Sequence, residues 1–304
     1  MSSAPGLRIA ITGASGMIGS MLAPALAGAG HTVIRIVRKA PAPGEIRWDP
    51  AGAGLEPVAL RGVDAVVHLA GENIAEGRWT AARKRALLES RKLGTRLLAE
   101  AMARAPDGPR TLVSASAIGY YGDRGDEELA ETSPPGSGFL PEVCREWEAA
   151  TSPAADTGVR VVLVRTGLVL TSAGGLLRRV MLPFQLGLGG RLGNGRQWMS
   201  WISAVDHIGV IRHALTGTMS GPLNSVAPGA VRNNDFTKAL GRALHRPTLL
   251  AVPRAAIRLV FGQMADEAIL ASAHVLPRVL ERTGYRFRHP SLESALADEF
   301  GATR

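Results

Sequence analysis

Several features of membrane, secreted and metal-binding proteins are missing from this sequence of 304 residues. No apolar run approaches the roughly 20 residues that a transmembrane helix needs. The first eight residues contain no apolar stretch long enough for a secretory signal. Cys144 is the only cysteine, which excludes an intramolecular disulfide. No activating feature stands near Cys144, so we interpret it as an inert thiol and expect a cytoplasmic protein.

Aromatic residues are also scarce, at 5%, although the chain is strongly basic, with a net charge of +9 and a sequence pI of about 10.6. Such a charge raises the question of nucleic acid. The arginines are scattered, however, and few aromatic rings are present to stack on bases. No group of His, Cys and carboxylate residues has metal-ligand spacing. We therefore expect a small-molecule substrate, no nucleic-acid, membrane or metal partner, and a monomer or homodimer.

Short apolar segments alternate with helical patterns through the first half of the chain. Near-continuous apolar strands separated by helices predict a parallel sheet that is covered on both faces. The fold class we expect is α/β, a doubly wound parallel sheet of the Rossmann type. The predicted strands are 7–12, 31–37, 64–69, 111–114 and 160–164, and the predicted helices include 17–29 and 79–105.

The pattern changes after about Thr166. A glycine-rich stretch, 187–195, predicts loops that approach a ligand or another segment closely. A helix over 205–216, with Asp206 as its N-cap, and a strand over 222–226 follow. We expect an NADP-binding Rossmann domain over 1–170, to which 205–226 returns. The remainder of 171–304 is expected to form a smaller, mostly helical substrate-side and C-terminal region.

The strongest motif is a glycine loop directly after the first strand and directly before the first helix. Its spacing is GxxGxxG, formed by Gly13, Gly16 and Gly19. Gly13 allows a tight turn, Gly16 a close approach to a pyrophosphate, and Gly19 close packing of helix on strand. The N–H groups of the helix N-terminus then favour a diphosphate. We predict a dinucleotide site that also includes Ser15, Met17 and Ile18.

The end of the second strand indicates which dinucleotide is bound. An acidic residue there would accept hydrogen bonds from the ribose hydroxyls of NAD, but Arg38 and Lys39 occupy this place. Two cations suit a ribose 2′-phosphate. We therefore predict NADP(H) rather than NAD, the alternative being a solvated basic strand end.

Further candidates follow the other strands, because the carboxyl ends of parallel strands meet at one edge of the sheet. Small residues after the strand at 64–69 leave room for adenine and ribose, whereas His68 itself is interpreted as a core histidine. We predict cofactor contacts from Leu69, Ala70, Gly71, Glu72, Ser114 and Ala115. Ser116, Tyr120 and Tyr121 carry hydroxyls that can polarise a carbonyl or donate a proton, and they are the candidate catalytic residues.

Taken together, these motifs resemble those of the extended short-chain dehydrogenase/reductases. The resemblance extends to one atypical subgroup, known as epimerase family proteins, and covers nearly the whole chain. Its C-terminal module of unknown function is similar to residues 253–300. The stretches that carry the resemblance are TGASGMIG, DAVVHLAG, HLAGENI, SASAIGYYG, WEAA, GGLLRRVMLPFQLGLGGRLGNG, WISAVD, LNSVAP and GYRFRHPSLESAL.

The resemblance implies a YxxxK pair downstream of the serine, with the tyrosine as acid/base and the lysine lowering its pKa. Here Phe139 and Val143 stand at those two positions, although Ser116 keeps the serine position. Two interpretations stay open. In one, Tyr120 or Tyr121 replaces the missing acid in an oxidoreductase or epimerase. Its substrate is then a small carbonyl or alcohol, a class that includes sugar-nucleotide-like compounds. In the other, the chain binds NADP without turnover, as a regulatory or redox-sensing protein.

A substrate pocket is expected beside the nicotinamide. Asn73 and Trp79 follow the third strand, and an ordinary helix entry is the alternative for both. The resemblance adds Asn194 and Trp201 from the second region. Arg165, at the end of a strand, is predicted to pair with a carboxylate or a phosphate, and the sequence does not decide between them.

Overall fold

A seven-stranded parallel sheet lies at the centre of the protein, whose computed structural model describes residues 6–301. Its strands are β1 (Arg8–Thr12), β2 (Thr32–Val37), β3 (Ile46–Arg47), β4 (Ala65–His68), β5 (Thr111–Ala117), β7 (Arg160–Thr166) and β12 (Gly221–Ser225). They lie in the order β12-β7-β5-β4-β1-β2-β3. The direction of winding reverses between β1 and β4, which opens a crevice at their carboxyl ends. The predicted doubly wound Rossmann fold is confirmed.

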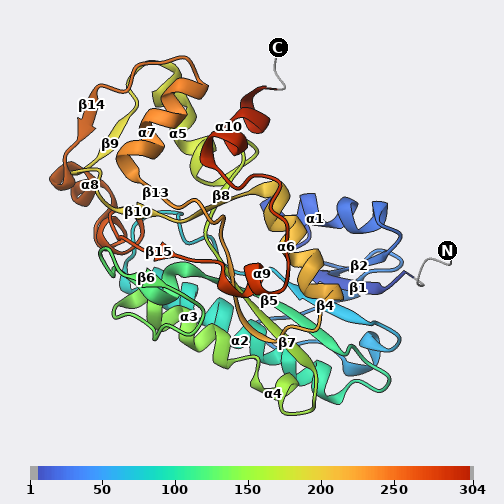
Figure 1. Ribbon diagram of the computed structural model, residues 1–304. Coiled ribbons are helices and arrows are strands. Elements are labelled where there is room, and N and C mark those ends of the chain that lie inside the picture. Colours follow the sequence, from blue (N-terminus) through green and yellow to red (C-terminus); the bar gives the residue numbers. More distant parts are fainter. Residues whose placement is uncertain (1–5, 302–304) are drawn as a thin grey trace.

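Helices cover both faces of this sheet (Figure 1). On one face lie α1 (Met17–Gly28) and α6 (Ala204–Thr216), and on the other lie α2 (Ala81–Arg104) and α4 (Ser152–Ala155), with α3 (Phe139–Ala149) packed against α2. Alternation along β1 divides the core, because Ile9 and Ile11 pack beneath α1 and α6 whereas Ala10 packs beneath α2. Both faces of the sheet are therefore buried, as a parallel sheet requires.

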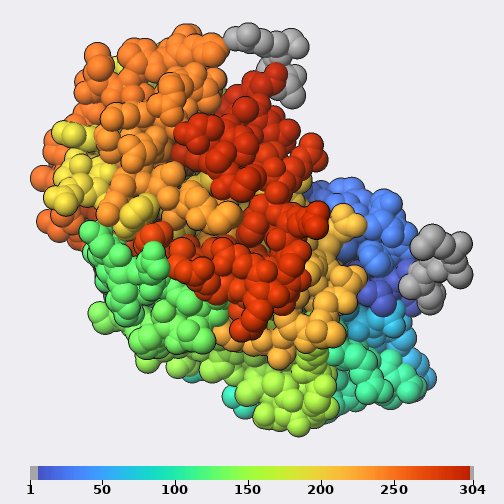
Figure 2. All heavy atoms as spheres, in the orientation of Figure 1, coloured from blue at the N-terminus to red at the C-terminus, as the bar shows by residue number. Residues whose placement is uncertain are grey.

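The remaining chain forms a second region around its own core. Helices α5 (Gly175–Gln185), α7 (Asn233–Ala243) and α10 (Leu292–Gly301) pack around the buried Trp201. Figure 2 shows this region as a lobe, coloured yellow to red, against the sheet domain. Beyond the helices we predicted, the described part of the chain contains four two-stranded ladders. They are β8 (Leu168–Leu170) with β11 (Trp201–Ser203), β9 (Gly190–Leu192) with β14 (Leu250–Val252), β10 (Trp198–Met199) with β13 (Val231–Arg232), and β6 (Glu128–Leu129) with β15 (His274–Val275).

Short elements complete the chain. The 3-10 helices η1 (Pro57–Leu60) and η2 (Ile118–Tyr121) lie in the sheet domain, and α8 (Arg254–Phe261), the π-helical turn η3 (Ala265–Ile269) and α9 (Arg278–Arg282) lie in the C-terminal part. Helix α6 and strand β12 return to the sheet, where β12 pairs with β7. Within residues 6–301, no helix has the length and apolar character needed to cross a bilayer.

The buried carboxylate of Asp206 joins α6 to the C-terminal part of the chain. We expected Asp206 to cap this helix, and that prediction is wrong, because the Ser203 hydroxyl accepts from the Asp206 N–H at 3.1 Å and is the cap. The Asp206 side chain, one turn into the helix, instead accepts from the N–H groups of Arg288 at 2.7 Å and His289 at 2.9 Å. The Tyr285 hydroxyl also donates to it, at 3.2 Å. Serine caps a helix as well as aspartate does, so the Asp206 side chain is not needed as the cap and can make tertiary contacts.

Candidate cofactor and active site

The glycine loop is packed so closely that two of its positions exclude a side chain. Gly13 has a φ of +68°, and a Cβ there would lie 3.0 Å from the backbone nitrogen of Ala70. A Cβ on Gly19 would lie 2.3 Å from the Gly13 carbonyl oxygen. Gly16 caps α1 without any side-chain hydrogen bond. The first-turn N–H groups of α1 are therefore left for an anion at the mouth of the crevice.

Buried hydrogen bonds fix the floor of this loop. The Thr12 hydroxyl accepts from the N–H groups of Leu69 at 3.1 Å and Ala70 at 3.2 Å, so its own proton is donated to Nδ1 of His68 at 2.7 Å. His68 is thereby the neutral tautomer that donates from Nε2 to Thr95 at 3.0 Å. Burial, with a smaller contribution from a nearby arginine, lowers the pKa of His68 to about 4. His68 is thus a structural histidine that ties β1, β4 and α2 together beneath the loop.

Arg38 and Lys39 lie beside this loop, at the exposed end of β2. The parallel register pairs Thr12 with Ile36, so the chain leaves β2 next to the point where the glycine loop leaves β1. Both side chains are exposed. A ribose bound at this edge of the sheet would meet two cations and no carboxylate from the strand end.

The segment after β4 rests on a buried arginine that sequence reasoning missed. Arg91, from the middle of α2, donates to the carbonyl oxygens of Leu87 at 3.1 Å and Glu72 at 2.9 Å. Its guanidinium carbon lies 3.4 Å from the position of a Cβ on Gly71. The Glu72 carboxylate is paired with Arg83 at 3.1 Å. Ala70 and Gly71 therefore stay accessible to a ligand, whereas the Glu72 side chain already has a partner.

The positions of the family's tyrosine and lysine lie in an apolar cluster. Phe139 and Val143, on α3, are buried together with Leu87 and Met264. Trp79 packs edge-on against Phe139 at 5.2 Å between ring centroids. No proton donor occupies either position, so α3 contributes packing here and not acid/base chemistry.

The predicted catalytic residues surround a buried ion pair. Arg165, at the end of β7, binds Glu148 of α3 in a bidentate pair, with Nε and Nη2 at 2.8 and 2.9 Å from the two carboxylate oxygens. Ser116 donates to the same carboxylate at 2.6 Å. The Tyr121 hydroxyl accepts from Arg165 at 3.0 Å and donates to Asn224 at 2.7 Å. A carboxylate, and not a phosphate, is therefore the partner of Arg165.

The three hydroxyl groups around this ion pair differ in their solvent exposure and in their hydrogen bonds. Tyr121 is fully buried, and burial raises its pKa to about 12, which argues against its predicted role as an acid. Ser116 is 3% exposed and engaged by Glu148. Tyr120 is half-buried, stacks on the Arg165 guanidinium at 3.5 Å from the ring centroid, and within residues 6–301 its hydroxyl has no hydrogen-bonding partner. Tyr120 alone of these three presents an unengaged hydroxyl.

Four other predicted residues are buried or already hydrogen-bonded within the chain. Trp201 is fully buried in the second core, so its predicted pocket role is wrong. Trp79 is buried as well and donates to the Ile74 carbonyl at 2.9 Å. Asn73 is exposed and closes its own turn by accepting from Ala75 at 3.0 Å. Ser114 is fully buried within β5, so its side chain is not available to a cofactor. The resemblance assigned Trp201 to the pocket, whereas its side chain fills the core of the second region.

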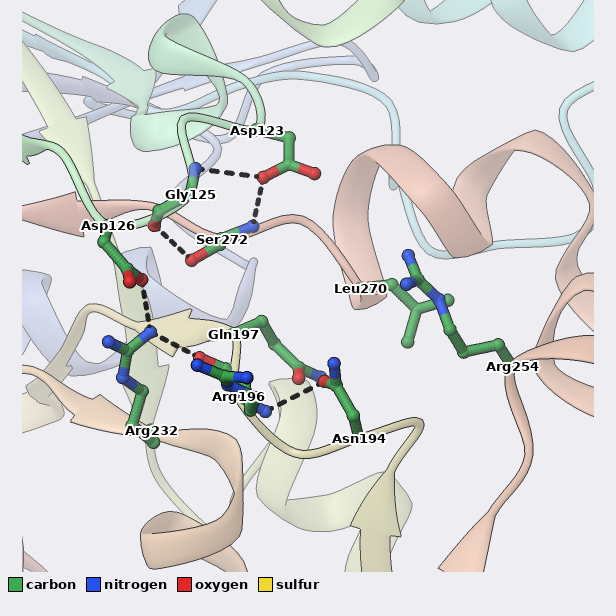
Figure 3. Close-up of a pocket in the computed structure, with 10 residues that line it drawn as sticks. All are labelled: Asp123, Gly125, Asp126, Asn194, Arg196, Gln197, Arg232, Arg254, Leu270 and Ser272. Carbon is green, nitrogen blue, oxygen red and sulfur yellow. Dashed lines mark hydrogen bonds and ion pairs between the residues drawn. The ribbon is translucent and has the colours of Figure 1, made fainter.

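A pocket of about 360 Å³ lies between a loop of the sheet domain and the C-terminal region (Figure 3). Asn194, a predicted substrate-pocket residue, lines it. Asp126 pairs with Arg232 across it at 2.6 Å, and Ser272 donates to the Gly125 carbonyl at 2.6 Å. The other lining residues are Asp123, Arg196, Gln197, Arg254 and Leu270.

Three arginines and two aspartates line this pocket, which leaves an excess of one positive charge: Arg196, Arg232 and Arg254 against Asp123 and Asp126. Within the described chain, the guanidinium groups of Arg196 and Arg254 make no hydrogen bond, although both line the cavity. Arg232 already neutralises Asp126 and lowers the pKa of that carboxyl. No group of three or more His, Cys, Asp and Glu residues within 6–301 could hold a metal ion. The pocket is therefore suited to an organic anion.

Comparison with known proteins agrees with this geometry. Residues 9–226 match the NAD dependent epimerase/dehydratase family, and residues 252–299 match a domain of unknown function, DUF1731. The chain belongs to the NAD dependent epimerase/dehydratase family. The predicted resemblance to epimerase family proteins of the extended short-chain dehydrogenase/reductase type is confirmed.

Three similar proteins cover nearly the whole chain. An epimerase family protein of Mycobacterium bovis is 49% identical over 290 residues, which are 95% of this chain and 96% of the relative. The crystal structure of human epimerase family protein SDR39U1 with NADPH has a TM-score of 0.88 at 36% identity and covers 98% of this chain and 100% of its own. A nucleoside-diphosphate sugar epimerase from Corynebacterium glutamicum has a TM-score of 0.82 at 40% identity; the match covers 98% of this chain and 59% of that longer one.

Family membership makes the apolar replacement at Phe139 and Val143 informative. The overall fold follows that of the solved relatives, but the tyrosine and lysine that the resemblance implies are replaced. The functional residues that sequence reasoning missed are charged groups brought in from helices, namely Arg91 and Glu148. Arg91 lies in none of the quoted motifs, and although Glu148 belongs to the WEAA stretch, its pairing with Arg165 follows only from the packing of α3.

Proposed function

We propose that this chain binds NADP(H) in the glycine loop and exchanges hydride between it and a small anionic carbonyl or alcohol compound. The observation that carries the proposal is the N-terminus of α1, which has no side-chain cap and opens onto a loop too tight for any side chain at Gly13 or Gly19. This arrangement suits a pyrophosphate. Membership of an epimerase/dehydratase family supports the same reading.

Arg38 and Lys39 support a preference for the 2′-phosphorylated cofactor. A hydrogen bond to a charged group contributes about 1.5–3 kcal/mol, so loss of the Arg38 contact should weaken NADPH binding roughly 10- to 100-fold. The structure of the human relative with NADPH agrees with this preference.

Calorimetric titration with NADPH and NADH tests the preference. We expect R38E to remove most of the difference between the two affinities, and R61E, at an exposed arginine elsewhere on the sheet domain, to preserve it. An NADPH/NADH affinity ratio that R38E leaves unchanged would sink the assignment.

For proton transfer we propose Tyr120, because its hydroxyl is unengaged while its ring lies on the Arg165 cation. Tyr121 and Ser116 are then positioning residues, because their hydrogen bonds hold Arg165 and Glu148 in place. With a carbonyl compound found active in a screen, Y120F should abolish NADPH oxidation at unchanged NADPH affinity. Activity of Y120F equal to that of the parent chain would remove Tyr120 from the mechanism.

For the substrate we propose an anion held by Arg196 and Arg254 in the pocket between the two regions. A library of carbonyl compounds should therefore be screened in which carboxylated or phosphorylated members are compared with their neutral analogues. We expect only the charged members to be turned over, and R196A/R254A to raise KM more than it lowers kcat. Equal turnover of neutral and charged members would argue against this site.

A second candidate function is binding of NADP(H) without turnover, in regulation or redox sensing. The apolar packing of Phe139 and Val143 favours it, since no acid/base pair is present at the usual positions. Stopped-flow measurement of bound NADPH against the same library separates the two candidates. Micromolar or tighter NADPH binding with no compound able to oxidise it would favour the binding protein.

A further inference from the structure

Helix α5 carries apolar residues on its outer side as well as on its inner side. The inner stripe, which includes Leu177 and Phe184, packs into the core of the second region. Four residues apart on the outer side stand Arg178, Leu182 and Leu186, all exposed, with each leucine 64% accessible. Surface helices normally turn polar residues outward. Two outward leucines on one stripe therefore indicate a contact that the isolated chain does not satisfy.

The apolar surface continues onto the neighbouring chain segment. Arg246 donates from Nε to the Gln185 carbonyl at 2.7 Å, and a Cβ on Gly187 would lie 3.8 Å from Pro247. Strand β9 follows α5 in the chain, and strand β14 runs parallel to β9 (Figure 1). Leu249, at the start of this segment, is 91% exposed. We define the leucine face as Leu182, Leu186, Leu188, Leu249 and Leu250, all of them exposed.

The segments that build this face contain no acidic residue. Residues 157–205 include six arginines and no Asp or Glu, and residues 236–265 include five lysines and arginines and again no Asp or Glu. Arg178 and Arg179 precede the leucines on α5, and within residues 6–301 their guanidinium groups form no hydrogen bond or ion pair. Arg246 stands at the junction of the two segments. The leucine face is therefore bordered by positive charge.

We propose that the leucine face docks this chain onto the surface of an anionic lipid bilayer. Leucines can enter the boundary between headgroups and acyl chains, while bordering arginines remain at the level of the lipid phosphates. Contact with a second copy of the chain would place these arginines against one another. Nucleic acid would use the cations but has no use for aliphatic leucines. The expectation of no membrane partner came from the lack of a spanning segment, which surface docking does not need.

Vesicle sedimentation tests the proposal with the full chain. The parent protein should pellet with vesicles of phosphatidylcholine and phosphatidylglycerol, and not with vesicles of phosphatidylcholine alone. Each basic residue near an anionic surface contributes about fivefold in partitioning, so R178E/R179E should lower binding at least ~20-fold. Each leucine replaced by serine should lower the partition coefficient about tenfold, so L182S/L186S/L249S should remove binding at every lipid concentration tested.

The double variant V58S/R61E is the matched control, because it removes an exposed valine and an exposed arginine from the sheet domain. It should pellet like the parent chain. Failure of the parent chain to pellet with anionic vesicles would overturn the proposal. So would pelleting that survives L182S/L186S/L249S. Concentration-dependent dimers in light scattering that these serines abolish, without vesicle binding, would assign the face to a second copy. A duplex DNA shift lost in R178E/R179E but kept in the serine variant would assign it to nucleic acid.

Discussion

The ion pair between Glu148 and Arg165 is nearly sealed from solvent, with 10% and 4% of the two side chains exposed. In Glu148→Ala, Arg165 would keep its contacts with Tyr121 and the Glu131 carbonyl but would lose both hydrogen bonds to the carboxylate. Each charge-assisted bond contributes about 1.5–3 kcal/mol. A buried charge left without its partner costs about 3–5 kcal/mol overall. We therefore expect the free energy of unfolding to fall by about 3–5 kcal/mol.

Urea unfolding followed by tryptophan fluorescence measures this loss, and the melting temperature should fall by about 6–15 °C on the usual scaling. The exposed pair of Arg278 and Glu281 provides the control, since E281A should change the unfolding free energy by less than about 1 kcal/mol. The double variant E148L/R165M removes both charges together and should recover most of the lost stability. A loss in E148A no larger than that in E281A would refute the reasoning.

Three further results are expected. Gly19→Ala should weaken NADPH binding by about 100-fold in calorimetry, because its Cβ would lie 2.3 Å from a loop carbonyl and displace the N–H groups that hold the pyrophosphate; an unchanged Kd would contradict the site. Cys144 is buried and its pKa is raised to about 12, so a thiol reagent should label it only as the chain unfolds in urea, and rapid labelling of the native chain would count against this burial. Burial lowers the pKa of His68 and His207 from 6.5 to about 4, so the unfolded chain alone takes up these protons and stability should fall between pH 6.5 and 4, by up to about 1.4 kcal/mol per pH unit for each histidine. Urea unfolding across this range should give a smaller slope for H68N, and an equal slope would remove His68 as a source.

The sheet and the glycine loop could be predicted because their signals are local. Four of the five predicted strands contain consecutive buried residues, and β2 alternates buried Ile34 and Ile36 with more exposed neighbours. Gly13 and Gly19 stand at a spacing that a turn between strand and helix imposes. The departure at Phe139 and Val143 could also be read directly, since it concerns residue type at fixed positions.

Side-chain direction could not be predicted in the same way. Tyr120 and Tyr121 are neighbours in one turn of 3-10 helix, yet one hydroxyl is unengaged and the other is buried against Asn224. The partner of Arg165 comes from Glu148, on another element, and only the packing of α3 brings the two together. Trp201 follows a glycine-rich stretch and nevertheless fills a core, because the second region needs a large side chain between its three helices.

The hydrogen bonds of the Asp206 carboxylate bear on whether this protein can be truncated. It is buried in a helix of the sheet domain, but the N–H groups of Arg288 and His289 that satisfy it belong to the C-terminal module. Removing that module would leave the Asp206 carboxylate with the Ser203 hydroxyl, at 2.9 Å, as its one remaining side-chain donor among those described. The boundary between the two matched domains is thus a boundary in sequence, whereas the hydrogen bonds of Asp206 cross it. A shortened chain that keeps only the first part would be a damaged protein and not a minimal one.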